Sequence, residues 1–180
     1  MFQHMVKRSL FYLVLIYPRY LTILGILTCS AYALPTDKEK VMHVKADTAN
    51  LNQHERKGIY AGNVELIQGT SNLQAAKAIT IGNEKNQLVL AVASGVKEKQ
   101  AHYWTVADLK KPPLHAYANT IRYYPLRHVV ELIGDARVEQ GNNSFSAAKI
   151  TYDIEKQQVL SQGDSKKRII IIYHPEKKSS

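Results

Sequence analysis

The side chains that could perform catalysis or bind a metal are scattered along this chain. The seven histidines, at positions 4, 43, 54, 102, 115, 128 and 174, show no metal-ligand spacing beside cysteine or clustered carboxylates. There is no G-x-S-x-G turn, and the acidic residues are spread among basic ones rather than paired. The sequence therefore predicts a protein without catalytic residues, a bound metal or a cofactor.

Aromatic pairs offer a different chemistry, which is apolar binding. Tyr103-Trp104 and Tyr123-Tyr124 fall in segments that read as strands, so each pair sends one ring to each face of a sheet. The inward rings either fill the core or line an apolar slot for acyl chains. Both interpretations stay open at this point.

A duplication organises the segments around these residues. Residues 46–89 and 118–160 match at an offset of about 72 residues, and both copies contain the triplet Ala-Ala-Lys, at 75–77 and 147–149. Small alanines favour close packing at a strand bend, and this interpretation is stronger than a phosphate site at the two lysines.

Each copy also contains a strand with period-two alternation, which indicates one buried and one solvated face. Gly62-Asn63 and Gly134-Asp135 recur inside these strands, and a glycine in a strand pattern indicates a bulge or tight turn. The residues expected on the apolar face are Tyr60, Val64, Leu66, Leu132, Ala136 and Val138.

Turn signals recur about every ten residues, and no segment has helical spacing. Roughly fourteen to sixteen strands are expected. The fold class is therefore all-β: a sandwich, barrel or jelly roll, or an open-ended two-layer stack built from the duplicated multi-strand unit. Such a stack leaves a slot between two sheets and an unpaired strand at each end.

The N-terminus has the layout of a secretory signal peptide, with a basic stretch, apolar runs and Ala31-Tyr32-Ala33 before the cleavage point. Cleavage of residues 1–33 removes the only cysteine, Cys29, and three of the 24 basic residues, so the net charge falls from +9 to about +6. This charge favours anionic partners, and export places nucleic acid last among them. An uncleaved membrane anchor is the alternative.

The C-terminus contains four consecutive isoleucines, at 169–172, which have no polar face. Such a strand is either covered on both sides or used as an edge for pairing. We expect the domain to span residues 34–174 and the tail, residues 175–180, to be disordered.

Several segments together resemble the OstA-like domain family: residues 41–47 (VMHVKAD), 60–64 (YAGNV), 133–136 (IGDA) and 149–152 (KITY). The resemblance covers essentially all of the chain after residue 33. It implies a slightly twisted β-jellyroll, open at both ends, that stacks head-to-tail with copies of itself in the periplasm.

The resemblance also implies a function and partners. Members carry lipopolysaccharide from the inner to the outer membrane, with the acyl chains of lipid A inside the jellyroll and the phosphorylated sugars in water. One end meets the inner-membrane-anchored LptC component, and the other meets the outer-membrane LptD translocon. At one family groove position the chain carries Pro125.

Two sets of residues follow from the alternation and the resemblance. The expected lipid-groove residues are Met42, Val44, Tyr60, Val64, Leu66, Tyr103, Tyr123, Leu132 and Val138. The expected assembly-edge residues are Val41, His43, Ile169, Ile170, Ile171 and Ile172. Two other functions stay open: a membrane-anchored LptC-like accessory of the same system, and a periplasmic glycan-binding β-domain.

Overall fold

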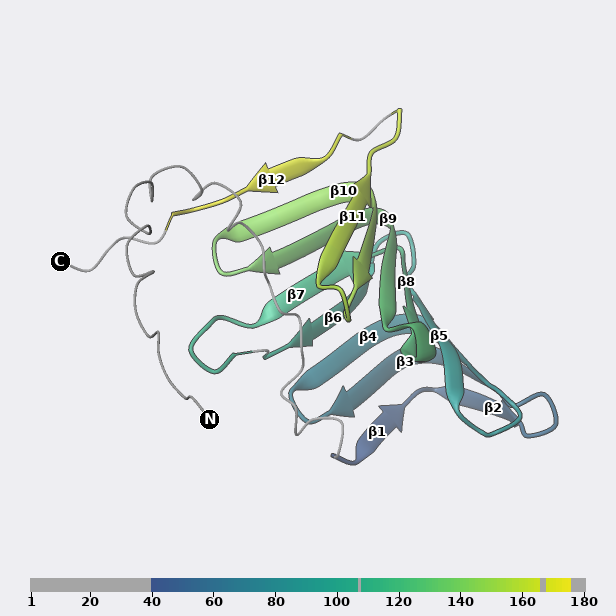
Figure 1. The fold of residues 1–180 in the computed structure, drawn as a ribbon. Helices are drawn as coiled ribbons and strands as arrows, with labels where there is room; N and C mark the ends of the chain where they lie inside the picture. Colours follow the sequence, from purple (N-terminus) through teal and green to yellow (C-terminus); the bar gives the residue numbers. More distant parts are fainter. Residues whose placement is uncertain (1–39, 107, 166–167, 176–180) are drawn as a thin grey trace, which may run out of the picture.

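The structure is a computed structural model that describes residues 40–106, 108–165 and 168–175. The predicted signal peptide and all but the first residue of the predicted tail lie outside these residues. The described chain is built from antiparallel strands (Figure 1). They are β1 (Met42–Lys45), β2 (Thr48–Asn52), β3 (Lys57–Gln68), β4 (Ser71–Gly82), β5 (Leu88–Ser94), β6 (Ala101–Thr105), β7 (Leu114–Ala118), β8 (Thr120–Tyr124), β9 (Val129–Gln140), β10 (Asn143–Asp153), β11 (Gln158–Gln162) and β12 (Ile170–Ile172).

All twelve described strands belong to one continuous sheet, which folds sharply across its middle. Strands β3, β4, β9 and β10 are long enough to cross the fold and serve both halves. For this reason the described strands number fewer than the fourteen to sixteen expected, and the two expected layers are halves of one sheet. Within the described residues, no helix is long and apolar enough to cross a membrane.

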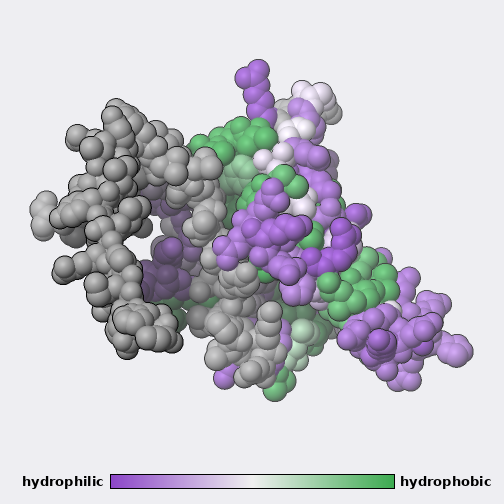
Figure 2. All heavy atoms as spheres, viewed as in Figure 1, coloured by the Kyte–Doolittle hydropathy of each residue, from purple (hydrophilic) through white to green (hydrophobic). Residues whose placement is uncertain are grey.

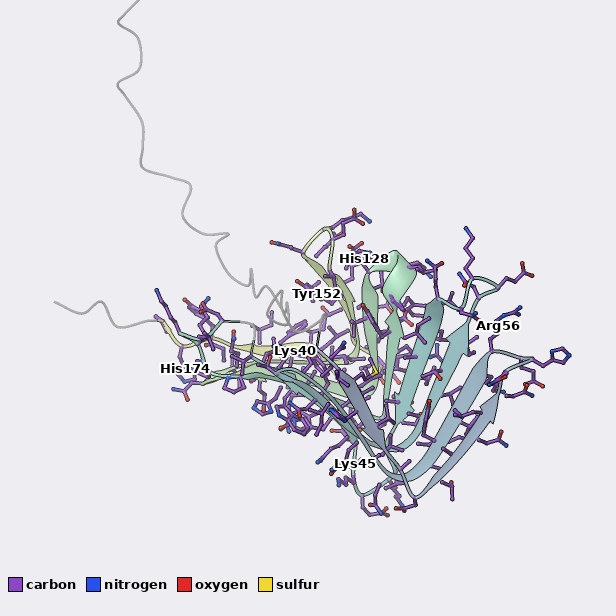
Figure 3. All side chains as sticks on the ribbon, turned by 90° about the horizontal axis from the view of Figure 1, so that it is seen from below. Lys40, Lys45, Arg56, His128, Tyr152 and His174 are labelled. Carbon is purple, nitrogen blue, oxygen red and sulfur yellow. The ribbon has the colours of Figure 1, made fainter. Side chains whose placement is uncertain are left out.

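We call the two halves arm 1 and arm 2. Arm 1 contains β1, β6, β7 and β12, and arm 2 contains β2, β5, β8 and β11, each with half of every long strand. Seen end-on, the arms form a V: Lys45 lies near the corner, and His174 and Arg56 lie toward the two free ends (Figure 3).

The corner is made by the two predicted bulges, which the structure confirms. Gly62 and Asn63 on β3, and Gly134 and Asp135 on β9, all have positive φ, and the register shifts beside each pair. In each case two residues oppose one alanine of the repeated triplet on the neighbouring strand. The extra residue bends the strand, so that the same side of the sheet faces inward in both arms.

Small side chains fill the corner. Ala101, Ala118, Ala136 and Ala147 are all fully buried there. They belong to one apolar cluster with larger residues of both arms, so the faces that carry them point toward each other. We call these the inner faces, and the alanines let the two arms approach closely where they meet.

Candidate functional site

The inner face of arm 1 carries a row of apolar side chains that crosses every strand of the arm. Paired residues in neighbouring antiparallel strands point to the same face, so the register of the strands defines the row. In order from β1 to β12 it consists of Val44, Leu66, Leu73, Tyr103, Ala116, Val138, Phe145 and Ile171.

The inner face of arm 2 carries an equivalent row. In order from β2 to β11 it consists of Leu51, Gly58, Thr80, Ala91, Tyr123, Val130, Tyr152 and Val159. A Cβ added at Gly58 would lie 3.0–3.1 Å from atoms of the Tyr60 side chain. The glycine therefore leaves room for the Tyr60 ring to lie against the strand. Together the two rows line an apolar trough that runs from one edge of the sheet to the other.

Tyrosines from the two arms influence each other across the middle of this trough. The pKa of the Tyr123 hydroxyl is raised, first because burial disfavours the phenolate and second because of nearby Tyr103. Tyr103 lies on β6 of arm 1 and packs against the core cluster. The Tyr123 hydroxyl therefore stays protonated and neutral at physiological pH.

The register places every predicted groove residue on the inner faces. Val64 and Leu132 are buried, whereas Met42 and Val44 are 48% and 40% exposed on the edge strand β1. Tyr60, Leu66, Tyr103, Tyr123 and Val138 are partly buried. Pro125 is not on a strand, because it begins the 3-10 turn η2 (Pro125–Arg127) between β8 and β9.

The predicted assembly residues lie at the two ends of the sheet. Strand β1 pairs only with β3, and β12 pairs only with β10, within the described chain. Ile171 is on the inner face opposite Phe145, whereas Ile170 and Ile172 lie on the outer face opposite serines. Val41 and Ile169 immediately precede the two strands, and His43 is on the outer face of β1.

Both ends of the trough expose apolar side chains. Met42, Val44 and Leu51 are exposed on the inner face at the N-terminal edge, and Val159 and Ile171 are exposed at the C-terminal edge. On the side of the molecule shown in Figure 2, apolar residues also gather over β12. Apolar side chains of the trough are therefore exposed at both of its ends.

Hydroxyl groups line the inner face near the free end of arm 1. The fully buried Thr105 hydroxyl lies 3.1 Å from Ser71 Oγ and 3.4 Å from Thr70 Oγ1. Ser71 Oγ is also 3.2 Å from the Tyr103 hydroxyl, which belongs to the apolar row one position deeper. The sequence analysis missed this hydroxyl cluster, because its members come from two segments more than thirty residues apart.

The outer face of arm 1 carries a stack of rings that the sequence analysis also missed. His102 stacks on Trp104 and Tyr117, with ring centroids 4.7 and 4.2 Å apart, and Arg137 lies 4.7 Å from the Tyr117 ring centre. His102 Nε2 and His115 Nδ1 are 3.0 Å apart, because the β6–β7 pairing brings together histidines thirteen residues apart. No group of three or more metal-binding side chains occurs among the described residues.

Burial is the main reason that the His102 pKa is lowered, and the neighbouring His115 and Arg137 charges add to the effect. The neutral form of the His102 ring is therefore favoured, and its Nε2 shares a hydrogen bond with His115 Nδ1. The rings face one another at small interplanar angles, so they leave mostly edges toward solvent. Such a stack joins β6 and β7 rather than offering a flat face to a sugar ring.

The chain is similar to known proteins over most of its length. Residues 43–158 match the family model described as LptA/(LptD N-terminal domain) LPS transport protein. The lipopolysaccharide export system protein LptH of Pseudomonas aeruginosa is 34% identical over 157 residues, which is 83% of this chain and 87% of that protein. The LptA proteins of Escherichia coli K12 and Haemophilus influenzae are 26% and 25% identical, over 81% and 87% of this chain and 77% and 90% of their own length.

A solved structure agrees with these matches. The crystal structure of LptH from Pseudomonas aeruginosa, described as the LptA-homologous periplasmic component of the lipopolysaccharide transport device, superposes with a TM-score of 0.68. It is 28% identical, and the match covers 78% of this chain and 100% of that one. The agreement shows an all-β, jellyroll-like fold that is not a closed barrel.

Proposed function

This chain belongs to the LptA/LptD N-terminal domain family of lipopolysaccharide transport proteins, and we propose that it carries lipopolysaccharide through its trough without catalysing a reaction. The acyl chains of lipid A lie between the inner faces of the two arms, and the phosphorylated sugars stay in water. The chain acts as one unit of a periplasmic bridge from the inner to the outer membrane.

The observation that carries this proposal is the mostly apolar row that crosses every strand on the inner face of each arm. Its rows reach from β1 to β12 in arm 1 and from β2 to β11 in arm 2, with exposed apolar side chains at both ends. Burial of apolar surface contributes about 25 cal/mol per Å². A lipid with several acyl chains therefore gains more from a long trough than from a closed pocket, and an open side lets its headgroup stay hydrated.

Site-specific photocrosslinking tests the proposal. A photoreactive residue in place of Tyr103 or Tyr123, on the inner faces, should crosslink to lipopolysaccharide. The same residue in place of Glu65 or Arg137, on the outer face of arm 1, should not. Equal crosslinking from both faces would contradict a lipid path inside the trough.

Unpaired edges support the proposed partners. Head-to-tail pairing of β1 with β12 of the next copy would continue the sheet and join the two troughs, as in β-strand addition. The same two edges would receive an LptC-type component at one end of a bridge and an LptD-type translocon at the other. The exposed isoleucines 170–172 then form part of the C-terminal docking edge.

A proline on this edge tests the assignment. Ile171→Pro should weaken concentration-dependent self-association measured by light scattering, because proline removes a backbone donor and disturbs the edge strand. If the mass of the variant still rose with concentration as in wild type, self-association would use another surface.

The proposed location of the chain is the periplasm, after cleavage behind Ala33. Mass spectrometry of the exported protein should find Leu34 as the first residue. A first residue before position 34 would instead favour a retained anchor and an LptC-like accessory role.

A further inference from the structure

The loop between β6 and β7 forms part of the free end of arm 1 and carries two adjacent cations, Lys110 and Lys111 (Figure 1). Both side chains are exposed. The ion pairs found among the described residues involve Lys45, Arg137, Lys149 and Lys156, and neither lysine of this loop. Among the described residues these two cations have no ion-pair partner, and they lie at the free end of arm 1 beside the trough.

Hydrogen bonds hold residues 108–112 of this loop in place. The Asp108 carboxylate accepts a hydrogen bond from the Lys110 backbone N–H at 2.9 Å, and the Asp108 carbonyl accepts one from the Lys111 N–H at 3.0 Å. Asp108 therefore orders the turn at the backbone. On the other side, the Pro112 carbonyl accepts a hydrogen bond from Gln140 Nε2, and the Pro112 ring lies beside Gly141.

Leu109 adds an apolar group at the same place. Its side chain is 80% exposed, which is the largest exposed fraction among the exposed large hydrophobic residues of the described chain. An apolar residue next to two lysines at the mouth of an apolar trough matches the junction between the acyl chains and the charged headgroup of an amphiphile.

The inner face below the loop changes in character with depth. The hydroxyl cluster of Thr70, Ser71, Thr105 and Tyr103 comes first, and the apolar row that contains Leu73 and Ala116 comes next. The fully buried alanines of the corner form the last layer. From the free end inward, arm 1 is thus cationic, then hydroxyl-lined, then apolar.

The other two turns at the free end of arm 1 lack adjacent cations. The β3–β4 and β9–β10 turns at the same end of arm 1 have the uncharged tips Gly69-Thr70 and Gly141-Asn142. In arm 2, Lys156 of the β10–β11 turn is bound by the Asp153 carboxylate at 2.9 Å. Among the described turns at the free end of arm 1, the β6–β7 loop is therefore the one that carries adjacent cations.

We infer that Lys110 and Lys111 of the β6–β7 loop form a headgroup subsite and bind a phosphate of the amphiphile, while the partly exposed hydroxyls of Ser71 and Tyr103 contact the sugar–acyl linkage below it. This inference rests on the proposed function and deepens it. Recognition is electrostatic and hydrogen-bonded, and lysine binds phosphate as a point charge at such sites.

Binding of two lipids to matched variants tests the inference. The probes are detergent-dispersed lipid A with both phosphates and the same lipid after phosphatase treatment. The test variant is Lys110→Ala/Lys111→Ala, and Lys110→Arg/Lys111→Arg is its conservative partner. The control is Lys97→Ala/Lys99→Ala, which removes the same charge from the exposed β5–β6 turn at the other end of β6.

Wild type should bind the phosphorylated lipid roughly tenfold more tightly than the dephosphorylated one. The double alanine variant should lose this preference and keep its affinity for the dephosphorylated lipid, whereas the arginine variant and the control should retain the preference. Added salt should reduce the preference in wild type.

Two results would overturn the inference while leaving the proposed function intact. One is equal wild-type affinity for both lipids, and the other is a loss of preference in the Lys97/Lys99 control as large as in the test variant. If wild type bound neither lipid, the proposed function itself would fail, and the inference would fail with it.

Discussion

At the scale of single residues, two outer-face contacts make the free energy of unfolding depend on pH in different ranges. The His102–His115 hydrogen bond lies within the ring stack of arm 1. The Lys149–Glu131 ion pair, at 2.6 Å, lies on arm 2 and is joined by the Tyr124 hydroxyl, which donates to Glu131 at 3.2 Å. In the folded chain, the first contact favours the neutral form of His102, and the second favours the ionised form of Glu131.

The His102 pKa is lowered below its ordinary value of 6.5, mainly by burial. The neutral imidazole therefore supports stability above about pH 6.5, and this contribution is lost as the pH falls through the lowered pKa. His115, Arg137 and Lys99 disfavour the protonated ring, and Glu139 favours it.

We expect His102→Gln to reduce the acid-induced loss of stability between pH 7 and pH 5 by roughly 0.5 kcal/mol, since solvent screens a partly exposed ring. Urea denaturation across this range provides the measurement, with His54→Gln in an exposed hairpin as the control. If the free energy of unfolding of His102→Gln depended on pH as in wild type, the ring stack would not contribute to the acid-induced loss of stability.

The Glu131 pKa is lowered from its ordinary value of 4.5, first by the hydrogen bond from Lys149. The pair should therefore contribute stability above about pH 4.5, and this contribution should disappear as the pH falls through the lowered pKa. Glu131→Gln should cost about 1 kcal/mol at pH 7 and little near pH 2. Glu65→Gln, which removes the exposed 3.9 Å pair with Lys45, should cost less at both pH values.

At the scale of elements, the bulges of β3 and β9 each form a backbone hydrogen bond with an equivalent residue of the two repeats. The Asp47 N–H donates to the Gly62 carbonyl and the Asn119 N–H donates to the Gly134 carbonyl, both at 2.9 Å. Asp47 and Asn119 are related by the same 72-residue offset as the two glycines. The duplication therefore repeats a complete corner, including the segment that supports it.

Gly134→Ala should destabilise the chain by about 2 kcal/mol in chemical denaturation. Gly134 has φ of +77°, and an added Cβ would lie 2.6 Å from Asn119 Nδ2. Gly82→Ala is a matched control, because the nearest atoms to its added Cβ are 3.5 Å away. Equal costs at the two positions would show that the corner does not require a glycine.

At the scale of the whole molecule, the two ends of the sheet are different surfaces. The N-terminal edge consists of β1 and β2, and the C-terminal edge consists of β11 and β12. An association between unlike surfaces is heterologous and can continue without closing, whereas one between like surfaces stops at a dimer.

Mixing two edge variants distinguishes these modes. Ile171→Pro and Val44→Pro should each stay monomeric alone, because each blocks a different end. In an equimolar mixture the intact ends should pair, so light scattering should report a mass of two chains and no further growth. A dimer of Ile171→Pro alone would instead indicate pairing of like N-terminal edges.

Local patterns in the sequence were sufficient to predict the all-β class, the bulges and the face on which Tyr60, Val64 and Leu66 lie. Alternation and glycine placement are properties of neighbouring residues, so they can be read along the chain. The strand number was overestimated because β3 and β4 each continue through the corner. The hydroxyl cluster and the His102–His115 contact depend on pairing between distant strands, which composition and spacing do not encode.

The continuous inner rows have a consequence for movement along the trough. Neighbouring strands are about 4.8 Å apart, so a ligand that advances by one strand exchanges one inner side chain for the next in the same row. It meets no enclosed compartment that it must leave before advancing. Under the proposed function, such a surface would act as a track with shallow steps that has no built-in direction for a lipid. The direction of travel must then come from supply at one end and removal at the other.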